Sequence, residues 1–353
     1  MVIHASWFTE LALRFAIGVS KHFDVVIVLD RDNFDRDCRG YIDVPPEVRC
    51  VLLPGLVRWR NLIRYISLLL RYRPDVIQLE EDVGHKHKLR GFMLASRWFA
   101  PTVWRVHDPH PHSGRDADQD ATTFRMRDLN RRDADLLIAH GSFCSRKLET
   151  LAATPVFESM HGVIHVPLQH RAPARDFLMI GRMEAYKGIE TLVEALTLLR
   201  SAGHAFTVTL AGQGPELDRL QSRLEQLGAV ILNKRLTSAE IIDHLQDHRA
   251  VVLPYKDATQ SGIVAAAFGN HRPVIASKVG GLEDVVIDGE NGLFVPPEDP
   301  KALAGAMQLF ATDDKLQHRL GQGARKAAEA SLNWDHIGAN FVAEVERRFP
   351  ETR

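Results

Sequence analysis

Short runs of apolar residues alternate with longer amphipathic stretches along the whole chain. In the first half, the runs predict strands at Val2–Ala5, Val25–Leu29, Val48–Leu53, Asp75–Leu79, Thr102–Val106 and Leu136–Ala139. In the second half, they predict strands at Phe177–Ile180, Phe206–Leu210, Val230–Leu232, Ala250–Leu253, Val274–Ala276 and Leu293–Val295. Stretches with helical periodicity lie between most of them, for example Phe8–Ser20, Asn61–Tyr72 and Leu89–Phe99. This alternation predicts βαβ units, and the unbroken apolar runs predict parallel sheets covered by helices on both faces.

A break in the pattern divides the chain. Residues 166–176 (VPLQHRAPARD) carry prolines and charges without an apolar period, as expected of a linker between domains. We therefore expect an α/β chain of two doubly wound, Rossmann-like domains facing a cleft. The expected parts are an acceptor-side domain at 1–168, a donor domain at 169–335 and a C-terminal helix at 336–353 that packs back toward the N-terminal domain. Ligands of such sheets bind at the carboxyl ends of the strands, so two facing domains suit a transfer between two substrates.

Composition and charge argue against several classes of protein. The 353 residues have a formal net charge of −1, which argues against a nucleic-acid partner. No run of about 18 apolar residues predicts a transmembrane helix, and the first residues, MVIHASWFTE, do not have the pattern of a signal peptide. The three cysteines, at positions 38, 50 and 144, are too widely spaced for a metal or disulfide framework. These features predict a cytoplasmic protein.

Two cations mark the turn after one strand of the second half. The segment FLMIGRMEAYKGIETLVEALTLL places Arg182 and Lys187 between a strand that ends at Gly181 and a helix that begins near Gly188. An arginine fork grips two phosphate oxygens and a lysine adds a point charge, so this strand end predicts a phosphate site. A pair of solvated charges in a surface turn is the other interpretation.

Two further strand ends in the same half carry compatible features. Gly212 and Gly214 form a tight turn in LAGQGPELDRL, before a helix that begins at Pro215. Gln260, Ser261 and Gly262 lead into a small-residue helix whose first N–H groups and dipole would favour a diphosphate. Each turn alone is ordinary in α/β proteins, but the three in order on one sheet edge favour a nucleotide site.

These segments resemble glycosyltransferase family 4, a group of retaining enzymes with the GT-B fold. GRMEAYKG resembles its GR-x-x-x-x-KG motif, LAGQGPE its next strand and turn, and HRPVIASKVGGLEDVVIDGENGLFVPPEDP its late donor-site block. The resemblance covers Phe177 to about Met307 and is weaker over the first half. It implies that Arg182 and Lys187 bind the diphosphate of a nucleotide-sugar donor.

The chain departs from the family in two places. The family usually has two glutamates eight positions apart, one at the transferred sugar and one at the ribose, and the register from Pro273 puts Ala258 and Ala266 there. Neither alanine side chain accepts a hydrogen bond, so Gln260 is the nearest candidate for a ribose contact. The family also has a glycine-rich loop after its first strand, whereas this chain has HASWFTEL. The first loop must therefore be built differently, unless residues that precede it in the native chain are missing.

Candidates in the first half follow predicted strands. His107 ends the strand Thr102–Val106, where the family often has a histidine near the transferred sugar, so the resemblance makes it a catalytic candidate; a histidine bonded to local backbone is the other interpretation. The acceptor-side candidates are Asp108, His110, His112, Glu80 and Glu81. Asp108 would otherwise cap a turn, Glu80 and Glu81 would otherwise lie in a solvated loop, and a metal at His110 and His112 lacks an obvious third ligand. Residues 58–73 are basic, aromatic and amphipathic, which fits either peripheral contact with the inner membrane face or a helix that covers the sheet.

The sequence therefore predicts a retaining transfer of a sugar from a nucleoside diphosphate sugar to a saccharide or lipid-linked saccharide. We expect no cofactor and no essential metal, because Arg182 and Lys187 supply the positive charge and no metal-binding acid pair follows a strand of the donor domain. A nucleotide-sugar epimerase is one alternative. A non-catalytic sugar-nucleotide-binding partner of another transferase is the other, suggested by the two missing glutamates.

Overall fold

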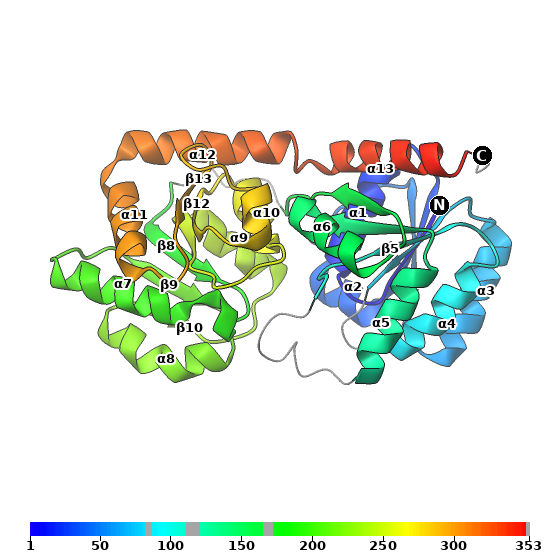
Figure 1. Cartoon of the computed structure of the whole chain (residues 1–353), viewed down its shortest axis with the longest axis horizontal. Helices are drawn as coiled ribbons and strands as arrows, with labels where there is room; N and C mark the ends of the chain where they lie inside the picture. The colour runs from blue at the N-terminus through cyan, green and yellow to red at the C-terminus, as the bar shows by residue number, and fades with distance from the viewer. Residues whose placement is uncertain (82–85, 111–120, 165–171, 351–353) are drawn as a thin grey trace. The chain divides into compact units, whose positions relative to one another are not determined.

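The computed structural model describes residues 1–81, 86–110, 121–164 and 172–350 (Figure 1). The chain divides into two compact units. The first comprises Met1–Pro109, Asp118–Gly162 and Asn333–Arg353, and the second comprises His110–Ala117 and Val163–Leu332. The expected domain boundary at residue 168 falls within 165–171, outside the described residues.

The first unit is built on a parallel sheet with the strand order β3-β2-β1-β4-β5-β6-β7. Its strands are β1 (Val2–Ala5), β2 (Val25–Asp30), β3 (Val48–Leu53), β4 (Ile77–Glu80), β5 (Thr102–Arg105), β6 (Leu136–His140) and β7 (Val156–Ser159). The apolar runs predict the first six to within two residues at each end. They do not predict β7, whose sequence VFES is short and mostly only half-buried.

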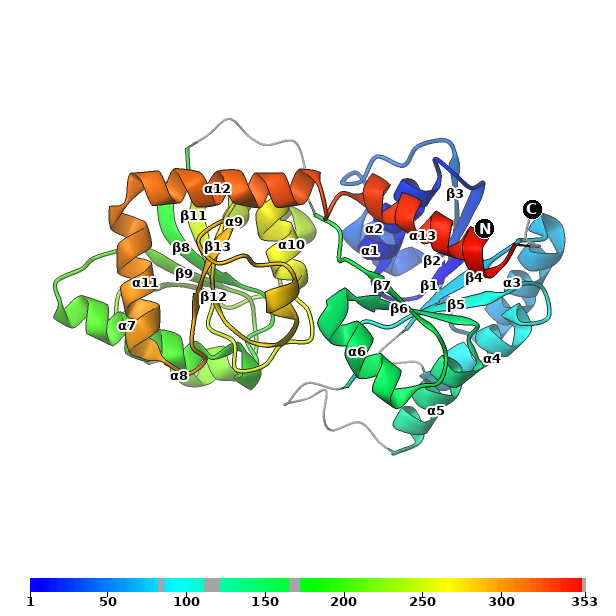
Figure 2. The same cartoon turned by 45° about the horizontal axis from the view of Figure 1, so that its top comes forward.

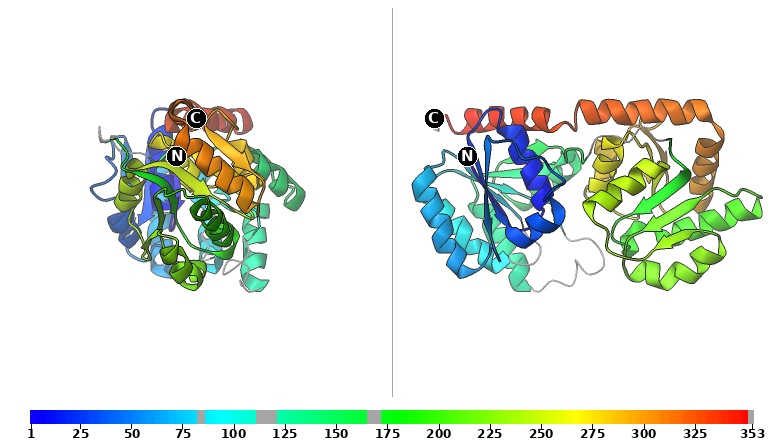
Figure 3. Two further views of the ribbon diagram at one scale, coloured as in Figure 1. Left: turned by 90° about the vertical axis from the view of Figure 1, so that its left-hand side faces the viewer. Right: turned by 180° about the vertical axis from the view of Figure 1, so that it is seen from behind.

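Helices cover both faces of this sheet. They are α1 (Thr9–Val19), α2 (Arg31–Asp37), α3 (Trp59–Tyr72), α4 (Lys86–Ser96), α5 (Ala121–Asp133), α6 (Gly141–Leu151) and α13 (Trp334–Arg348). Helix α13, the last of the chain, packs along α1 (Figure 3). A Cβ atom at Gly338 would lie 2.6 Å from the backbone of Gly18, so these glycines let the two helices touch.

The second unit has a parallel sheet with the strand order β10-β9-β8-β11-β12-β13. Its strands are β8 (Arg175–Ile180), β9 (Val208–Ala211), β10 (Val230–Leu232), β11 (His248–Leu253), β12 (Val274–Ser277) and β13 (Gly292–Val295). All six are predicted from the apolar runs, although β9 begins two residues later than expected.

Two groups of helices flank the second sheet (Figure 2). One group is α7 (Ile189–Ser201), α8 (Pro215–Gln226) and α11 (Pro300–Thr312), and the other is α9 (Ser238–Asp247), α10 (Gly262–Gly269) and α12 (Asp314–Glu329). Short 3₁₀ turns, η1 (Ala185–Lys187) and η2 (Gly280–Asp284), follow β8 and β12. Within each group the helices contact one another and bury the apolar positions of their periodic sequences.

Both sheets reverse their strand order at one point, between β1 and β4 in the first unit and between β8 and β11 in the second. Doubly wound sheets bind ligands at the carboxyl ends of the strands beside such a reversal. The α/β, doubly wound prediction is confirmed for each unit, and the topology directs the search for a site to the loops after β1, β4, β8 and β11.

Candidate functional site

Glycines bring four strand-end loops of the second unit into backbone contact. A Cβ atom at Gly188 would lie 1.8 Å from the carbonyl oxygen of Pro254, and one at Gly212 would lie 1.8 Å from that of Gly181. At Gly281 the corresponding distance to the Thr259 oxygen is 2.0 Å. Any side chain at these positions would collide with backbone, so glycine is required. The loops after β8, β9, β11 and β12 therefore converge more closely than side chains would permit.

The two predicted cations lie at this convergence. Arg182 follows β8 and is exposed, whereas Lys187 ends η1 and is buried. The Lys187 ammonium donates a hydrogen bond to the Tyr255 hydroxyl and lies 3.9 Å from the centroid of its ring. Burial raises the pKa of Tyr255, while the nearby charge of Arg182 opposes that rise. Both positive charges therefore act around a neutral phenol at the end of β11.

Tyr255 itself has no distinctive signal in the sequence. It follows Pro254 at the end of β11 and is fully buried, and its ring meets that of Tyr186 edge-on at 6.2 Å. The backbone N–H of Lys256 donates to the Tyr186 carbonyl over 2.7 Å. These contacts fix the η1 turn against the β11 loop, so the position of Lys187 is set by two aromatic side chains that the motif does not include.

The start of α10 completes this edge of the sheet. Ser261 occupies the N-cap position, yet its hydroxyl does not cap the helix. Gly262 is the first residue of α10, where backbone N–H groups lack partners within the helix. Within the described part of the chain, the Gln260 side-chain oxygen is buried without a hydrogen-bond partner. These groups are the ones expected to meet a diphosphate and a ribose.

Gly212 and Gly214 hold the β9 loop beside the β8 loop. Gly212 has a φ of 144° and its N–H donates to Leu232, while Gly214 would place a Cβ atom 2.4 Å from the Met183 carbonyl oxygen. The N–H of Met183 donates to Gln213 over 2.9 Å. The glycines thus act here as spacers that align the Arg182 loop.

The positions expected of the family glutamates are buried. Ala258 and Ala266 are each 1% exposed. The Ala258 carbonyl accepts the N–H of Gly281 over 3.1 Å, and the Ala266 carbonyl accepts bonds from Asn270. The sequence leaves open whether a glutamate at 266 would contact a nucleotide or disrupt packing, and this burial favours the packing outcome.

We expect Ala266→Glu to destabilise the second unit by about 1–3 kcal/mol from overpacking alone, because a longer side chain must enter a filled space. Gln260→Ala should leave the melting temperature unchanged and weaken nucleotide binding, since it removes a half-buried amide whose oxygen has no partner among the described residues. Melting temperature and calorimetric affinity measured on both variants check this pair. A stable Ala266→Glu protein that binds nucleotide more tightly would instead support a contact between the side chain at position 266 and the ribose.

At the carboxyl edge of the first sheet, a buried ion pair supports His107. Glu80 ends β4, and its carboxylate lies 3.1 Å from Nε of Arg105 and 2.9 Å from Nε2 of His107. Gln78 donates a further bond to Glu80 over 2.6 Å. Burial alone would raise the pKa of Glu80, but Arg105 and His107 outweigh it and hold that pKa below its usual value. Glu80 is therefore a carboxylate that orients the imidazole of His107.

The Glu81 side chain is also held by hydrogen bonds within the protein. Its oxygens accept bonds from Arg131 at 2.7 and 2.9 Å and from the indole N–H of Trp104 at 2.9 Å. The interpretation of Glu80 and Glu81 as a solvated loop is wrong, because both side chains are buried and paired with cations. Sequence spacing gives no sign that Arg105 and Arg131 are their partners.

The turn after β1 replaces the family's glycine-rich loop with aromatic residues. Phe8 precedes α1 with φ 50° and ψ 36°, a left-handed conformation that costs a bulky residue about 1–3 kcal/mol. Its ring stacks on His107 with the centroids 3.7 Å apart. The Ser6 carbonyl accepts a bond from Asn33 over 2.7 Å. Trp7, held between these anchors, is 41% exposed.

Histidines continue from His107 along the same edge. The rings of His107 and His140 have centroids 5.3 Å apart, and those of His140 and His161 are 5.5 Å apart. Burial lowers the pKa of His140 well below its usual value and that of His161 to about 4. Both rings are therefore neutral at pH 7. His140, which ends β6, is not among the residues selected from the sequence, because one histidine at a strand end is a weak signal.

The remaining acceptor-side candidates lie in the loop after β5. Asp108 is half-buried, and its backbone carbonyl accepts a bond from Arg131 over 2.8 Å. His110 is half-buried, and His112 lies outside the described residues. Among the residues that the structure describes, no group of three or more His, Cys, Asp or Glu side chains could hold a metal ion.

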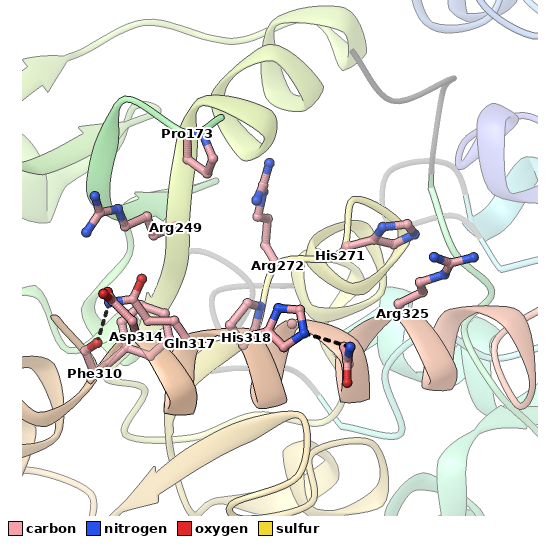
Figure 4. Close-up of a pocket in the computed structure, with 12 residues that line it drawn as sticks. Pro173, Arg249, His271, Arg272, Phe310, Asp314, Gln317, His318 and Arg325 are labelled. Atoms are coloured by element: carbon pink, nitrogen blue, oxygen red, sulfur yellow. Dashed lines mark hydrogen bonds between the residues drawn. The ribbon is translucent and has the colours of Figure 1, made fainter. Parts of the chain in front are cut away.

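A separate pocket of about 400 Å³ lies at the opposite edge of the second sheet (Figure 4). Pro173, Arg249 and Pro273 place it at the amino ends of β8, β11 and β12, and residues of α12 form its other wall. Its basic side chains point in different directions along the groove, and Arg272 donates to carbonyls at the end of α9. This pocket is therefore distinct from the strand-end constellation around Lys187.

Sequence comparisons match the second unit to a known family. Residues 164–327 match the family described as Glycosyl transferases group 1. The D-inositol 3-phosphate glycosyltransferase of Jonesia denitrificans is 29% identical over 307 residues, which cover 75% of this chain and 72% of that protein. The glycogen synthase of Mycobacterium tuberculosis is 31% identical over 180 residues, 50% of this chain, and the match spans 43% of that protein's length.

Solved structures share the fold at low sequence identity. Sucrose-phosphate synthase from Thermosynechococcus elongatus has a TM-score of 0.73 and 19% identity, with 99% of each chain covered. HepE from Anabaena in complex with UDP and glucose has a TM-score of 0.71 and 15% identity, with 98% of this chain and 99% of that chain covered. These matches confirm the predicted GT-B fold class of two Rossmann-like domains. Residues 164–327 thus match the group 1 glycosyltransferase family, and the motifs that carry the resemblance in the sequence lie within this segment.

Proposed function

We propose that the protein is a retaining glycosyltransferase that uses a nucleoside diphosphate sugar. The observation that carries this proposal is the meeting of Arg182, Lys187 and the start of α10 at the strand reversal of a group 1 glycosyltransferase domain. Fixed positive charge in a partly buried site stabilises negative charge that grows on a leaving diphosphate. The structure of HepE with UDP and glucose adds support from a protein of the same fold.

In the proposed step, the bond between the anomeric carbon of the sugar and the diphosphate oxygen breaks. A new bond forms on the same face between that carbon and an acceptor hydroxyl, whose proton passes to the departing phosphate oxygen. Arg182 and Lys187 neutralise the diphosphate, and His107 lines the sugar site. The buried carboxylate of Glu80 keeps the His107 ring oriented, and it acts as a positioning residue.

The reaction is expected to proceed without a divalent metal, because the two cations take the place of a metal clamp on the diphosphate. Turnover with excess chelator should equal turnover with added magnesium or manganese. Loss of turnover in chelator that returns on adding either metal would contradict this expectation.

Product analysis separates the proposal from its two alternatives. A panel of nucleotide sugars incubated with and without saccharide and lipid-linked acceptors should release nucleoside diphosphate together with a glycosylated acceptor. A changed sugar nucleotide formed from donor alone would instead show an epimerase. Donor binding without turnover under every condition would favour the binding partner.

A surface on α3 supports a lipid-linked acceptor. Asn61, Tyr65 and Leu69 are buried against the sheet, while a second apolar stripe on the same helix is exposed and comprises Trp59, Ile63 and Leu70, with Ile66 half-buried. Trp59 is 71% exposed, and Trp98, which follows the neighbouring helix α4, is 89% exposed. A helix that only covers the sheet would have a polar outer face. The outer face here carries an exposed apolar stripe beside exposed arginines.

The charge of α3 fits an anionic membrane surface. Its sequence, WRNLIRYISLLLRY, contains three arginines and no acidic residue, and Arg58 and Arg73 flank it. The Arg60 guanidinium lies 5.8 Å from the centroid of the Trp59 ring. Exposed tryptophan with surrounding arginine is typical of helices that lie in the membrane interface. We therefore propose peripheral docking through 58–73. In the part of the chain that the structure describes, no helix has the length and apolar content of a membrane span.

Vesicle sedimentation tests this docking. The protein should bind vesicles of mixed anionic and zwitterionic lipid and not purely zwitterionic ones, and a variant with Trp59, Ile63 and Leu70 changed to serine should bind at least about tenfold more weakly. Leu309→Ser, another exposed leucine on α11, serves as the control. If the triple variant binds vesicles as tightly as the wild type, this surface is not the membrane-docking site. A dimer in solution that the same changes disrupt would also exclude membrane docking here.

A further inference from the structure

The first unit presents an aromatic side chain at the edge where its ligand is expected. Trp7 lies in the turn after β1, directly beside the strand reversal between β1 and β4. Among the described residues of this unit, the other exposed large apolar side chains lie on α3, near or in α4 and at the end of α6. Among the described strand-end loops of this unit, Trp7 is therefore the one large apolar side chain that is exposed. One exposed apolar side chain is ordinary on a protein surface, so the position of Trp7 at this strand end and the backbone that holds it there are what point to a ligand.

The backbone around Trp7 is held in a conformation that keeps the indole outward. Phe8 adopts the left-handed region, which bulky residues rarely occupy, and its ring is fixed by stacking on His107 at 3.7 Å. On the other side, the Ser6 carbonyl is anchored to Asn33 of α2. Strain that the surroundings maintain is typical of ligand sites. The same stacking links the turn directly to the imidazole that the proposed reaction places beside the transferred sugar.

We propose that Trp7 is the stacking platform for a sugar ring of the acceptor. The C–H groups on one face of a pyranose pack against an indole face, while the hydroxyls at the ring edge remain free for hydrogen bonds. Asp108, which is partly accessible, follows β5 at the same edge of the sheet and offers a polar group for such bonds. This arrangement takes the place of the glycine-rich loop that the family has after its first strand, and it selects a saccharide over an acceptor without a ring. The inference rests on the proposed function.

Kinetics with a soluble saccharide acceptor test the platform. Trp7→Ala should raise the acceptor KM roughly tenfold, the loss of one aromatic contact, while the affinity for nucleoside diphosphate stays that of the wild type. Trp7→Phe should recover most of the acceptor KM, because it restores an aromatic face. Leu151→Ala removes an exposed leucine at the end of α6 and should change neither constant. An unchanged acceptor KM in Trp7→Ala would overturn the inference.

A binding measurement keeps this test independent of turnover. Saturation-transfer NMR with a panel of glucose, mannose and N-acetylglucosamine oligosaccharides should show the C–H protons of one ring in contact with the wild-type protein. The signal should fall at least about fivefold in Trp7→Ala and remain in Trp7→Phe. Equal signal in Trp7→Ala, or no saccharide bound by the wild type, would overturn the platform. Failure of the proposed function would appear separately, as wild-type protein that binds saccharide and transfers no sugar.

Discussion

Lys187→Met is expected to weaken binding of nucleoside diphosphate about 10- to 100-fold, the loss of one charge-assisted bond of roughly 1.5–3 kcal/mol. Methionine has a side chain of similar length, so the change removes the ammonium beside the Tyr186 and Tyr255 rings together with its hydrogen bond to the Tyr255 hydroxyl. Arg182→Ala should have a smaller effect, because that side chain is exposed and water competes for its partners. Titration calorimetry with the wild type and each variant measures both losses.

The control for this experiment is Lys326→Met on α12, whose lysine side chain is 80% exposed. It changes the net charge equally and should leave affinity unchanged. Raising the ionic strength should weaken donor binding by the wild type more than by Lys187→Met, because the variant has one less charge at the site. If both Lys187→Met and Arg182→Ala bind nucleoside diphosphate with wild-type affinity, the donor does not bind at this strand edge.

Most of the fold follows from the period of apolar residues. Parallel strands that are buried on both faces need unbroken apolar runs, and sequences such as VVIVLD and HRAVVL supply them. The pattern fails at β7, where VFES is too short and too polar, and at α2, whose RDNFDRD has no buried residue to give it a period. Pairing with β6 holds β7, and the Asp30 side chain caps α2.

In the candidate site, residues of local motifs could be predicted from the sequence, whereas their long-range partners could not. Arg182, Lys187 and the turn glycines are local signals, because short motifs fix them at the ends of β8 and β9, and the structure brings them to the predicted edge. Tyr255 meets Lys187 across 68 positions of sequence, and Glu81 meets Arg131 across 50. Such pairs depend on strand order, which periodicity does not determine. The amphipathic character of α3 is visible in the sequence, but only burial shows that a second apolar stripe is exposed beside the one that faces the sheet.

The order of the first unit's strands also explains why its carboxylates are structural. β4 lies between β1 and β5, so Glu80 is covered by neighbours on both sides and must find its counter-charge inside the protein. Arg105 of β5 provides it, beside Glu80 in the parallel register. The Arg105 guanidinium also packs over the Phe15 ring, 4.1 Å from its centroid. In the sequence, Glu80 is only an acidic residue at the end of a strand. In the structure it is one partner of a buried ion pair with Arg105.

Glu80→Gln should therefore destabilise the protein by about 3–5 kcal/mol, because it leaves the buried Arg105 cation without its counter-charge. The variant should also respond differently to acid. Because the folded protein lowers the pKa of Glu80 below its usual value of 4.5, the unfolded chain takes up this proton first as pH falls. The stabilising contribution of Glu80 is thus complete above pH 4.5 and is lost as pH falls through the lowered pKa. The Gln variant lacks this loss, so its stability should change less with pH in that range.

The double variant Glu80→Leu/Arg105→Met is the matched control for this prediction. Replacing both partners of a buried pair with apolar residues is often neutral or stabilising, so the double variant should recover most of the stability that Glu80→Gln loses. Denaturant unfolding at pH 7 and pH 4 on the wild type and both variants gives the comparison. Because His107 loses the charged carboxylate of Glu80 in either variant, both should show reduced turnover even where stability returns. A Glu80→Gln protein as stable as the wild type at pH 7 would mean that Arg105 has another source of compensation, and the buried pair would not hold this edge of the sheet.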